Sequence, residues 1–270
     1  MYRLPGLSLR AACRIVEAAQ EAFSWWNCRG RPRELSVSEA LRLTLWRLRR
    51  NLTYADLGEI FGIGASTAWE YVQEITEFLV DLLSTSTQEV REMVTGKICL
   101  VDGALVPTVN WRHRGDLRSG KRHSTGMNTQ VVTDVHGRVT TTSRPFPGKR
   151  HDKKCFDESD LPTALGDSGG LVGDAGYQGV DMITPVKKQP GQGRRAGDKE
   201  FNRGLARLRA PAERGIAHLK NWWVLSTRYR SELDRLEGDL IVVTGLQRMN
   251  DFLLGRTIKL DRIAKIGLSE

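Results

Sequence analysis

Apolar residues recur at helical spacing through the first third of the chain. Between residues 7 and 27 they form one face of a predicted helix: Leu9, Ala12, Ile15, Val16, Ala19 and Phe23. A second helix is predicted from Glu39 to Asn51, where Ser36 or Ser38 can cap its start. Two more helices are expected, one from Thr53 to Phe61 and one from about Ala65 to Leu83, joined by a tight turn at Gly62-Ile63-Gly64.

Two helices joined by a glycine turn at this spacing are typical of a helix-turn-helix, here at about residues 36–83. The last helix has one apolar face, formed by Ala68, Val72, Ile75 and Leu79. Ser66, Thr67, Glu70 and Gln73 point the other way, where a recognition helix contacts bases, and we expect Ser66, Thr67 and Gln73 to bind DNA. Because Glu70 and Glu74 are acidic, we expect the helix alone to bind DNA modestly. The alternative is a helical hairpin used for dimerisation.

After Gly96 the pattern changes to strands. Strands are predicted at 98–101, 128–134, 139–142, 171–173 and 181–186, of which the second and third form a hairpin. Helical stretches are expected at 152–159 and 201–223, and a flexible basic loop at 187–199. Residues 84–96 are expected to be a polar connection. This order predicts an α/β domain with a mixed sheet at residues 96–255, after a helical domain at 1–95 and before a tail at 256–270.

Composition excludes some classes of protein. The chain has 270 residues, 40% of them hydrophobic, and no run near the ~18 apolar residues of a membrane span. No continuous apolar stretch follows the first arginines, so no signal peptide is expected. The four cysteines form no C-x-x-C pair, which favours reduced structural thiols in a cytoplasmic protein.

Charge is distributed unevenly along the chain. The net charge is +9, but residues 1–95 hold 11 Lys/Arg against 12 Asp/Glu. Residues 109–154 hold 11 against 3 and residues 187–230 hold 12 against 3, whereas residues 155–186 hold six acids and no Lys or Arg. Two basic blocks around an acidic stretch indicate a protein that binds a polyanion around a metal centre. The run Arg29-Gly30-Arg31-Pro32-Arg33 is a basic linker or a short minor-groove hook.

Two carboxylates follow predicted strands. Asp102 ends the apolar run Ile98 to Val101, and Asp174 follows Leu171-Val172-Gly173. A carboxylate leaving a buried strand is costly to desolvate unless a cation or hydrogen bonds receive it, so the pair suggests a site for a hard divalent metal. Glu213, on the predicted helix at 201–223, is a third candidate. The alternative is that both aspartates cap turns.

In this order the motifs resemble those of bacterial DDE insertion-sequence transposases with an N-terminal helix-turn-helix, the group related to Harbinger elements. The resemblance covers about Gly30 to Leu254. After the helix-turn-helix it is carried by these pieces: Val101-Asp102-Gly103, Val106-Pro107, the hairpin from Thr129 to Asp134, Gly148-Lys149-Arg150-His151-Asp152 with Phe156, Asp174 to Gly179, and the Glu213 helix ending in Leu225 to Arg230.

The resemblance implies an RNase H-like fold with a mixed five-stranded sheet flanked by helices. It implies that Asp102, Asp174 and Glu213 are catalytic and hold two Mg²⁺ (or Mn²⁺) ions, with Glu200 as the fallback for Glu213. Arg209 and Lys220 share a helical face with Glu213 and are expected to bind phosphates, as are Lys149 and Arg150. His151 and Asp152 are supporting candidates.

The implied activity is metal-dependent cleavage of DNA at terminal inverted repeats, followed by transfer of the freed 3′-OH to target DNA. The implied partner is double-stranded DNA, bound by a homodimer, with no membrane. Trp222 and Trp223 either stack on flipped bases or anchor their helix in the core. The alternatives are an inactive or domesticated relative that only binds DNA, a structure-selective nuclease on the same fold, and a metal-free interaction protein.

Overall fold

The computed structural model of the chain describes residues 4–23, 32–109, 114–120, 123–188, 191, 193 and 195–253. They divide into two units, which are described separately. The first comprises the described parts of residues 1–84 and 221–270, and the second is Thr85–Lys220. This grouping differs from the expected division at 95/96 and 255/256. The predicted Arg29–Arg33 linker lies mostly outside the described residues, as do Cys28 and the tail at 256–270.

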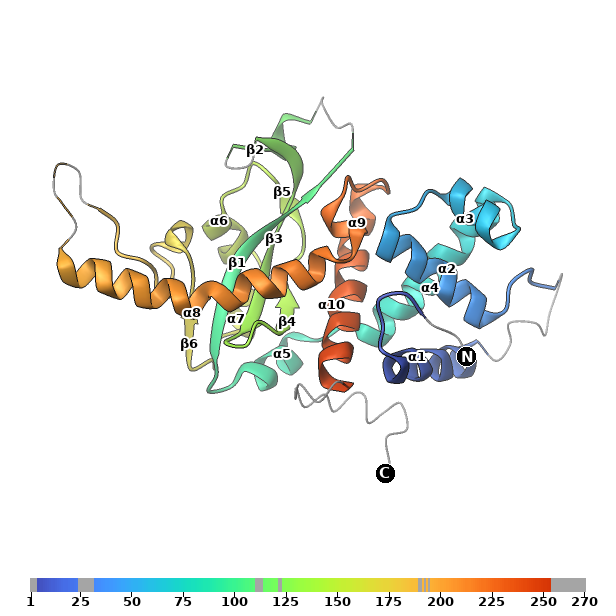
Figure 1. The fold of residues 1–270 in the computed structure, drawn as a ribbon, viewed down its shortest axis with the longest axis horizontal. Coiled ribbons are helices and arrows are strands. Elements are labelled where there is room, and N and C mark those ends of the chain that lie inside the picture. The colour runs from blue at the N-terminus through green and yellow to red at the C-terminus, as the bar shows by residue number, and fades with distance from the viewer. Residues whose placement is uncertain are drawn as a thin grey trace. The chain divides into compact units, whose positions relative to one another are not determined.

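The first unit is helical. Its elements are α1 (Leu9–Ala22), α2 (Val37–Arg50), α3 (Tyr54–Phe61), α4 (Ala65–Leu83), α9 (Trp223–Ser226), the 3₁₀ helix η3 (Leu233–Arg235) and α10 (Leu236–Leu253) (Figure 1). Ser36 and Thr53 begin α2 and α3 with capping boxes, each with an acidic residue three positions on. Gly62 ends α3 at φ +71°, a conformation that glycine adopts without steric cost. The helix-turn-helix predicted from these signals is confirmed.

The last described helix, α10, packs against α4 and α1. Its buried face is apolar: Leu236, Leu240, Val242, Val243, Leu246 and Met249. Gly245 allows close approach, because a methyl group there would lie 2.5 Å from Leu83 Cβ. Asn250 contributes polar contacts to the N-terminal segment, accepting a hydrogen bond from Ser8 N and donating one to the Gly6 carbonyl. The helix-turn-helix therefore shares one core with the C-terminal helix.

The second unit is built on a mixed sheet. Its strands are β1 (Ile98–Pro107), β2 (Arg118–Ser119), β3 (Ser124–Asp134), β4 (Val139–Thr142), β5 (Phe146–Pro147) and β6 (Gly170–Val172). The order is β2-β3-β1-β6, and β4 and β5 both pair with β3. Within it β1 runs antiparallel to β3 and parallel to β6. The predicted α/β class with a mixed sheet is confirmed.

Helices cover this sheet. They are α5 (Thr87–Val94), η1 (Gly115–Leu117), α6 (Asp152–Asp157), α7 (Leu161–Ala164), η2 (Ala175–Tyr177) and α8 (Ala196–Lys220). Alternate residues of β1 face opposite ways. Cys99 and Val101 belong to a core with residues of α5, α6 and α7, whereas Leu100 packs with Leu205 and Ala212 of α8. Figure 1 shows α8 running across the face of β1 and β3.

Two expectations about local structure were wrong. Residues 84–96 contain helix α5, whose Val90 and Val94 are buried in the core of the second unit, so the segment is not only a polar connection. Residues 181–186 form no strand, and only Ile183 pairs with Val172 as an isolated bridge. The described sheet counts six strands because it includes β2 and β5, two-residue segments that sequence periodicity does not register, and its mixed α/β architecture is consistent with the expected RNase H-like fold.

Two observations apply to the described residues alone. No helix among them is long and apolar enough to cross a membrane. Cys13, Cys99 and Cys155 are free thiols, and burial raises the pKa of Cys99 to about 11 and that of Cys155 to about 12. Both buried thiols are therefore protonated and unreactive near neutral pH.

Candidate active site

Asp102 lies within β1, on the same face as Leu100 and therefore on the α8 side of the sheet. Its side chain is 19% exposed. Arg209 of α8 approaches it, with Nη2 3.9 Å from Asp102 Oδ2. The Gly103 amide donates a hydrogen bond of 2.9 Å to Asp102 Oδ1. The charge of this half-buried carboxylate is thus balanced by one of the arginines expected to bind phosphate.

Asp174 follows the neighbouring strand β6. The two strands are parallel, and their last paired residues are Leu100 and Val172. Asp102 and Asp174 each come two residues later, so they lie at the same level along the strands. Asp174 also caps η2, because its Oδ1 accepts a 2.7 Å hydrogen bond from Gly176 N. The turn-capping alternative is thus correct for the local geometry of Asp174 and is compatible with a second role.

Asp152, the first residue of α6, brings a third carboxylate to this region. A methyl group at Gly103 would overlap Asp152 Oδ1, so the carboxylate lies directly against the glycine that follows Asp102. A methyl group at Gly176 would lie 2.8 Å from Asp174 Oδ1 and 3.6 Å from Asp152 Oδ2. Asn128 of β3 holds Asp152 by donating a 2.8 Å hydrogen bond to Oδ1. Sequence motifs gave Asp152 only a supporting role, and the signal that could have raised it was the glycine directly after Asp102.

The pKa of Tyr177 is affected by the charges of all three carboxylates. Its side chain is fully buried, and its hydroxyl donates a hydrogen bond to Gln130 Oε1. Burial raises the pKa of Tyr177 well above its ordinary value, and the negative charges of Asp152, Asp102 and Asp174 raise it further. Three carboxylates therefore act on one buried group. Their oxygen atoms are the ligands that Mg²⁺ prefers, so the donor chemistry fits a divalent metal.

Glu213 is placed differently. It lies on α8, and its side chain is exposed, as is that of the fallback Glu200. The residue of α8 that reaches Asp102 is Arg209, one helical turn earlier. Among the described residues, no three His, Cys, Asp or Glu side chains are arranged closely enough to hold a metal ion as they stand. The structure places Asp152 against Gly103 and close to Asp174, whereas the Asp102 side chain points to the α8 side of the sheet and Glu213 is exposed.

The remaining phosphate-binding candidates differ in exposure and in their ion pairs. Lys149 and His151 are exposed, whereas Arg150 is ion-paired with Glu158 and lies over the ring of Phe146. Lys220, at the end of α8, is half-buried. Lys149, Arg150, His151 and Asp152 all line a cavity of about 550 Å³. The basic motif is therefore adjacent to the carboxylate of Asp152.

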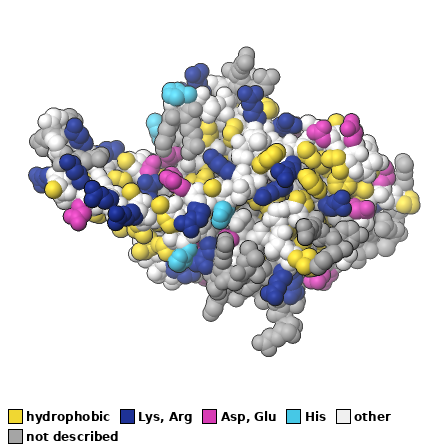
Figure 2. All heavy atoms as spheres, in the orientation of Figure 1, with side chains coloured by type: hydrophobic (Ala, Val, Ile, Leu, Met, Phe, Trp, Pro, Cys, Tyr) yellow, Lys and Arg dark blue, Asp and Glu magenta, His cyan; other side chains and the backbone are white. Residues whose placement is uncertain are grey.

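Helix α8 also carries an exposed basic stripe, formed by Lys199, Arg203, Arg207 and Arg214. At 100° per residue these four side chains fall within about 80° of one another, on the side opposite the buried Leu205. Figure 2 shows Lys and Arg side chains in dark blue gathered along this helix, on the left of the view. A duplex could bind there through its phosphates.

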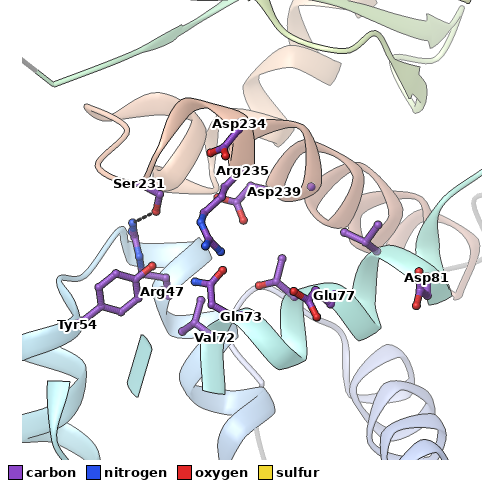
Figure 3. Close-up of a pocket in the computed structure, with 13 residues that line it drawn as sticks. Arg47, Tyr54, Val72, Gln73, Glu77, Asp81, Ser231, Asp234, Arg235 and Asp239 are labelled. Carbon is purple, nitrogen blue, oxygen red and sulfur yellow. Dashed lines mark hydrogen bonds between the residues drawn. The ribbon is translucent and has the colours of Figure 1, made fainter. Parts of the chain in front are cut away.

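The predicted DNA contacts of the helix-turn-helix lie in different surroundings. Ser66 is exposed and Thr67 is half-buried. Gln73 lines a cavity of about 280 Å³ between α4 and the η3–α10 segment, where Figure 3 shows it close to Arg235 and Asp239. Arg235 also lies over the ring of Trp69, 5.4 Å from its centroid. The hairpin from Thr53 to Ser84 has six acidic and no basic residues, so phosphate contacts have to come from other elements.

The two tryptophans have separate environments. Trp222 is fully buried, and Arg49 lies over its ring at 5.3 Å, so of the two alternatives the core anchor applies to this residue. Its size and burial make it a core anchor. Trp223 is 44% exposed and lies beneath Arg50 at 4.8 Å.

Comparison with known proteins gives two family matches and two similar proteins. Residues 101–248 match the family described as DDE superfamily endonuclease, and residues 33–85 match the helix-turn-helix of DDE superfamily endonuclease. A protein of Streptomyces albus G named as transposase for insertion sequence element IS112 is 28% identical over 253 residues, which cover 92% of this chain and 93% of that protein. One of Microchaete diplosiphon, named as transposase for insertion sequence element IS702, is 25% identical over 239 residues, covering 85% and 86%.

No solved structure gave a significant match. The family match begins at Val101, directly before Asp102, and includes Asp152, Asp174 and all of α8. Together with the helix-turn-helix, it accounts for both units of the structure. The chain therefore belongs to the DDE superfamily endonucleases, among the bacterial insertion-sequence transposases that carry an N-terminal helix-turn-helix.

Proposed function

We propose that the protein binds the terminal inverted repeats of an insertion sequence, cuts a DNA strand there and joins the freed 3′-OH to target DNA. One observation carries the proposal: two carboxylates, Asp102 and Asp174, lie at the same level of adjacent parallel strands within the segment that matches the endonuclease family. A homodimer on DNA is part of the proposal, because two transposon ends have to be brought together. Since the substrate is chromosomal DNA, we expect action at the nucleoid.

We propose that Asp102, Asp174 and Glu213 are the catalytic residues and hold two Mg²⁺ or Mn²⁺ ions. Such ions, when bound, activate the attacking oxygen and stabilise the leaving oxygen of a phosphodiester. Arg209 holds the charge of Asp102 at 3.9 Å and would turn to a phosphate once DNA arrives. Asp152 supports the carboxylates from the α6 side, and His151 is its exposed neighbour.

Other residues position the DNA in this proposal. Arg209, Lys220, Lys149 and Arg150 contact phosphates by charge. Ser66, Thr67 and Gln73 contact the terminal repeat through α4, and for Gln73 this requires the side chain to leave the cavity that it lines. The acidic hairpin cannot bind phosphates itself. Nearby arginines such as Arg50 and Arg230, both exposed in the same unit, bind them instead.

Cleavage of terminal-repeat DNA in Mg²⁺ tests the proposal. The Asp102→Ala variant should lose nicking while it keeps DNA affinity, because Asp102 lies in the second unit and outside the helix-turn-helix. Binding without nicking by the unaltered protein would instead identify an inactive relative. Nicking without any joining of the 3′-OH to target DNA would identify a structure-selective nuclease.

A further inference from the structure

The cavity of about 280 Å³ between α4 and the η3–α10 segment lies wholly within the first unit. In the proposed function it is only the place that Gln73 leaves. At about 30 Å³ for each water molecule, its volume corresponds to roughly nine waters, which is room for an organic molecule of about seven heavy atoms. The chemistry of the lining determines which molecule fits.

Asp239 is the buried acid of this cavity. It is 8% exposed, and Figure 3 shows its carboxyl group directed from α10 toward α4. The Tyr229 hydroxyl donates a 2.9 Å hydrogen bond to Oδ2. Within the part of the chain that the structure describes, no hydrogen bond reaches Oδ1 and Asp239 forms no ion pair. A buried carboxylate with an open oxygen is stabilised by a cation that enters the cavity.

The two guanidinium groups that line the cavity have other partners. Arg47 donates hydrogen bonds to Asn51 and, at 2.9 Å, to Ser231 Oγ. Arg235 Nε lies 3.5 Å from Glu232 Oε2, outside the cavity lining. Both arginines act on the buried carboxyl group through their charge, without an ion pair to it. Its position for a cation is therefore open.

Three further carboxylates line the cavity, and all three are exposed: Glu77 and Asp81 of α4 and Asp234 of η3. Among the described residues, none of these three side chains has a partner in an ion pair or a hydrogen bond. With Asp239, four carboxylates face two guanidinium groups, so the lining has a net negative charge when all of them are ionised. Such a lining attracts cations.

The spacing of the acids favours an organic cation over a metal ion. Among the described residues, no three acidic, His or Cys side chains lie close enough together to hold a metal ion. Val72 and Val80 of α4 add apolar surface to the same wall. A chain of methylene groups with an ammonium group at each end matches separated carboxylates beside an apolar wall.

We propose that this cavity binds an aliphatic diamine. One ammonium group binds Asp239, the methylene chain lies along Val72 and Val80, and the other ammonium group binds the exposed carboxylates of Glu77 and Asp81. This ligand goes beyond the proposed function, because binding it requires neither DNA nor catalysis. It lies between α4 and α10 and connects the two helices.

Isothermal titration calorimetry of the full-length protein with 1,5-diaminopentane, at about pH 8 and low salt, measures the binding. The neutral comparison is 1,5-pentanediol, which has the same chain length and no charge. We expect one site for the diamine and no binding of the diol. Binding of the diol as tight as that of the diamine would overturn the proposal, because the carboxylates would then have no part in recognition.

Variants place the diamine in the cavity. Asp239→Asn keeps an acceptor for the Tyr229 hydroxyl and removes the charge, so it should fold and weaken binding about tenfold or more. The double variant of Glu77→Gln and Asp81→Asn, both at exposed positions, should also weaken binding. Glu59→Gln is the matched control, because Glu59 is an exposed acid of the same unit outside the lining. Unchanged affinity in Asp239→Asn would overturn the proposal.

The pH dependence gives a second readout. Burial raises the pKa of Asp239 to about 6. The charged and titratable groups around it are the Tyr229 hydroxyl, Arg47 of α2, Arg235 of η3 and, across the cavity, Glu77 of α4. Because an ammonium group binds the ionised carboxylate, affinity should rise up to about tenfold per pH unit below about pH 6 and level off above about pH 7. Asp239→Asn should lose this rise. The same rise in the variant would show that another group binds the ammonium and would overturn the assignment.

Discussion

Gly103 sets the position of the Asp152 carboxylate. It follows Asp102 on β1 and points to the opposite side of the sheet, where Asp152 occupies the space that a side chain would take. Asn128 fixes the same carboxylate from β3. A glycine at position 103 is therefore a steric requirement for the observed position of the Asp152 carboxylate.

The Gly103→Ala variant should lose activity through Asp152. The new methyl group displaces the carboxylate, and a misplacement of this kind costs about 100-fold in rate. Asp152→Asn keeps the acceptor for Asn128 and removes the charge, and it should cost a similar factor. If both act on one interaction, the double variant is no slower than the slower single variant in a nicking assay. Multiplying effects would show that the two residues act separately.

Asp239 of α10 is a second residue with an unusual environment. Burial raises the pKa of Asp239 to about 6, although the Tyr229 hydroxyl, at 2.9 Å, and the charges of Arg47 and Arg235 lower it. Figure 3 shows Asp239 and Arg235 in the cavity beside α4. Ionising this carboxyl therefore costs free energy in the folded protein.

The stability of the first unit should depend on pH in a defined window. Between about pH 4 and pH 6 the folded state holds a proton on Asp239 that the unfolded state has lost, so the free energy of unfolding falls as pH rises, by up to roughly 3 kcal/mol. Asp239→Asn removes this cost. Urea unfolding should show a gain over the unaltered protein at about pH 8 that is much smaller at about pH 4. An equal difference at both values would contradict the assignment.

At the scale of elements, the sequence predicted those whose ends carry local signals. The capping boxes at Ser36 and Thr53 and the glycine turn after Phe61 act within a few residues, so the helix-turn-helix could be found without tertiary information. The strands before Asp102 and Asp174 were found in the same way. Helix α10 was not, because its run Ile241 to Thr244 is β-branched and suits a strand as well as a buried helix.

The sequence identified the candidate residues of the site more readily than the contacts between them. Spacing identified Asp102 and Asp174, but the contact between Asp152 and Gly103 depends on how the loop before α6 packs on β1. Helical geometry grouped Arg209, Glu213 and Lys220 on one face of α8, and it could not show that Arg209 would reach Asp102 while Glu213 stays exposed. The roles of Glu213 and Lys220 stay predictions.

The basic stripe of α8 should contribute affinity without contributing chemistry. Lys199, Arg203 and Arg207, three of its four residues, are exposed and lie opposite the face that packs on the sheet. Replacing all three by alanine should weaken DNA binding at low salt and lower the slope of log affinity against log salt by about 2 to 3. The rate of nicking at saturating DNA should stay unchanged. A loss of rate with unchanged affinity would place the stripe in the catalytic machinery instead.

At the scale of the whole molecule, the two units differ in how the chain builds them. The second unit is one continuous segment, Thr85–Lys220, whereas the first needs two segments separated by that whole length. The helix-turn-helix therefore belongs to the same unit as α10. Its α4 packs against α10, where Arg248 Nη2 donates a 2.8 Å hydrogen bond to the Leu83 carbonyl.

Truncation should separate the units. A chain ending at Lys220 loses six buried apolar side chains of α10, which removes roughly 10 kcal/mol of burial and is comparable to the entire stability of a domain. We expect residues 1–84 of that chain to lose cooperative unfolding and become sensitive to protease, while residues 85–220 alone keep a cooperative urea transition. Adding back a peptide of residues 221–253 should restore protease resistance. A protease-resistant N-terminal region in the truncated chain would show that α1 to α4 fold without α10, and the shared core described above would then be dispensable.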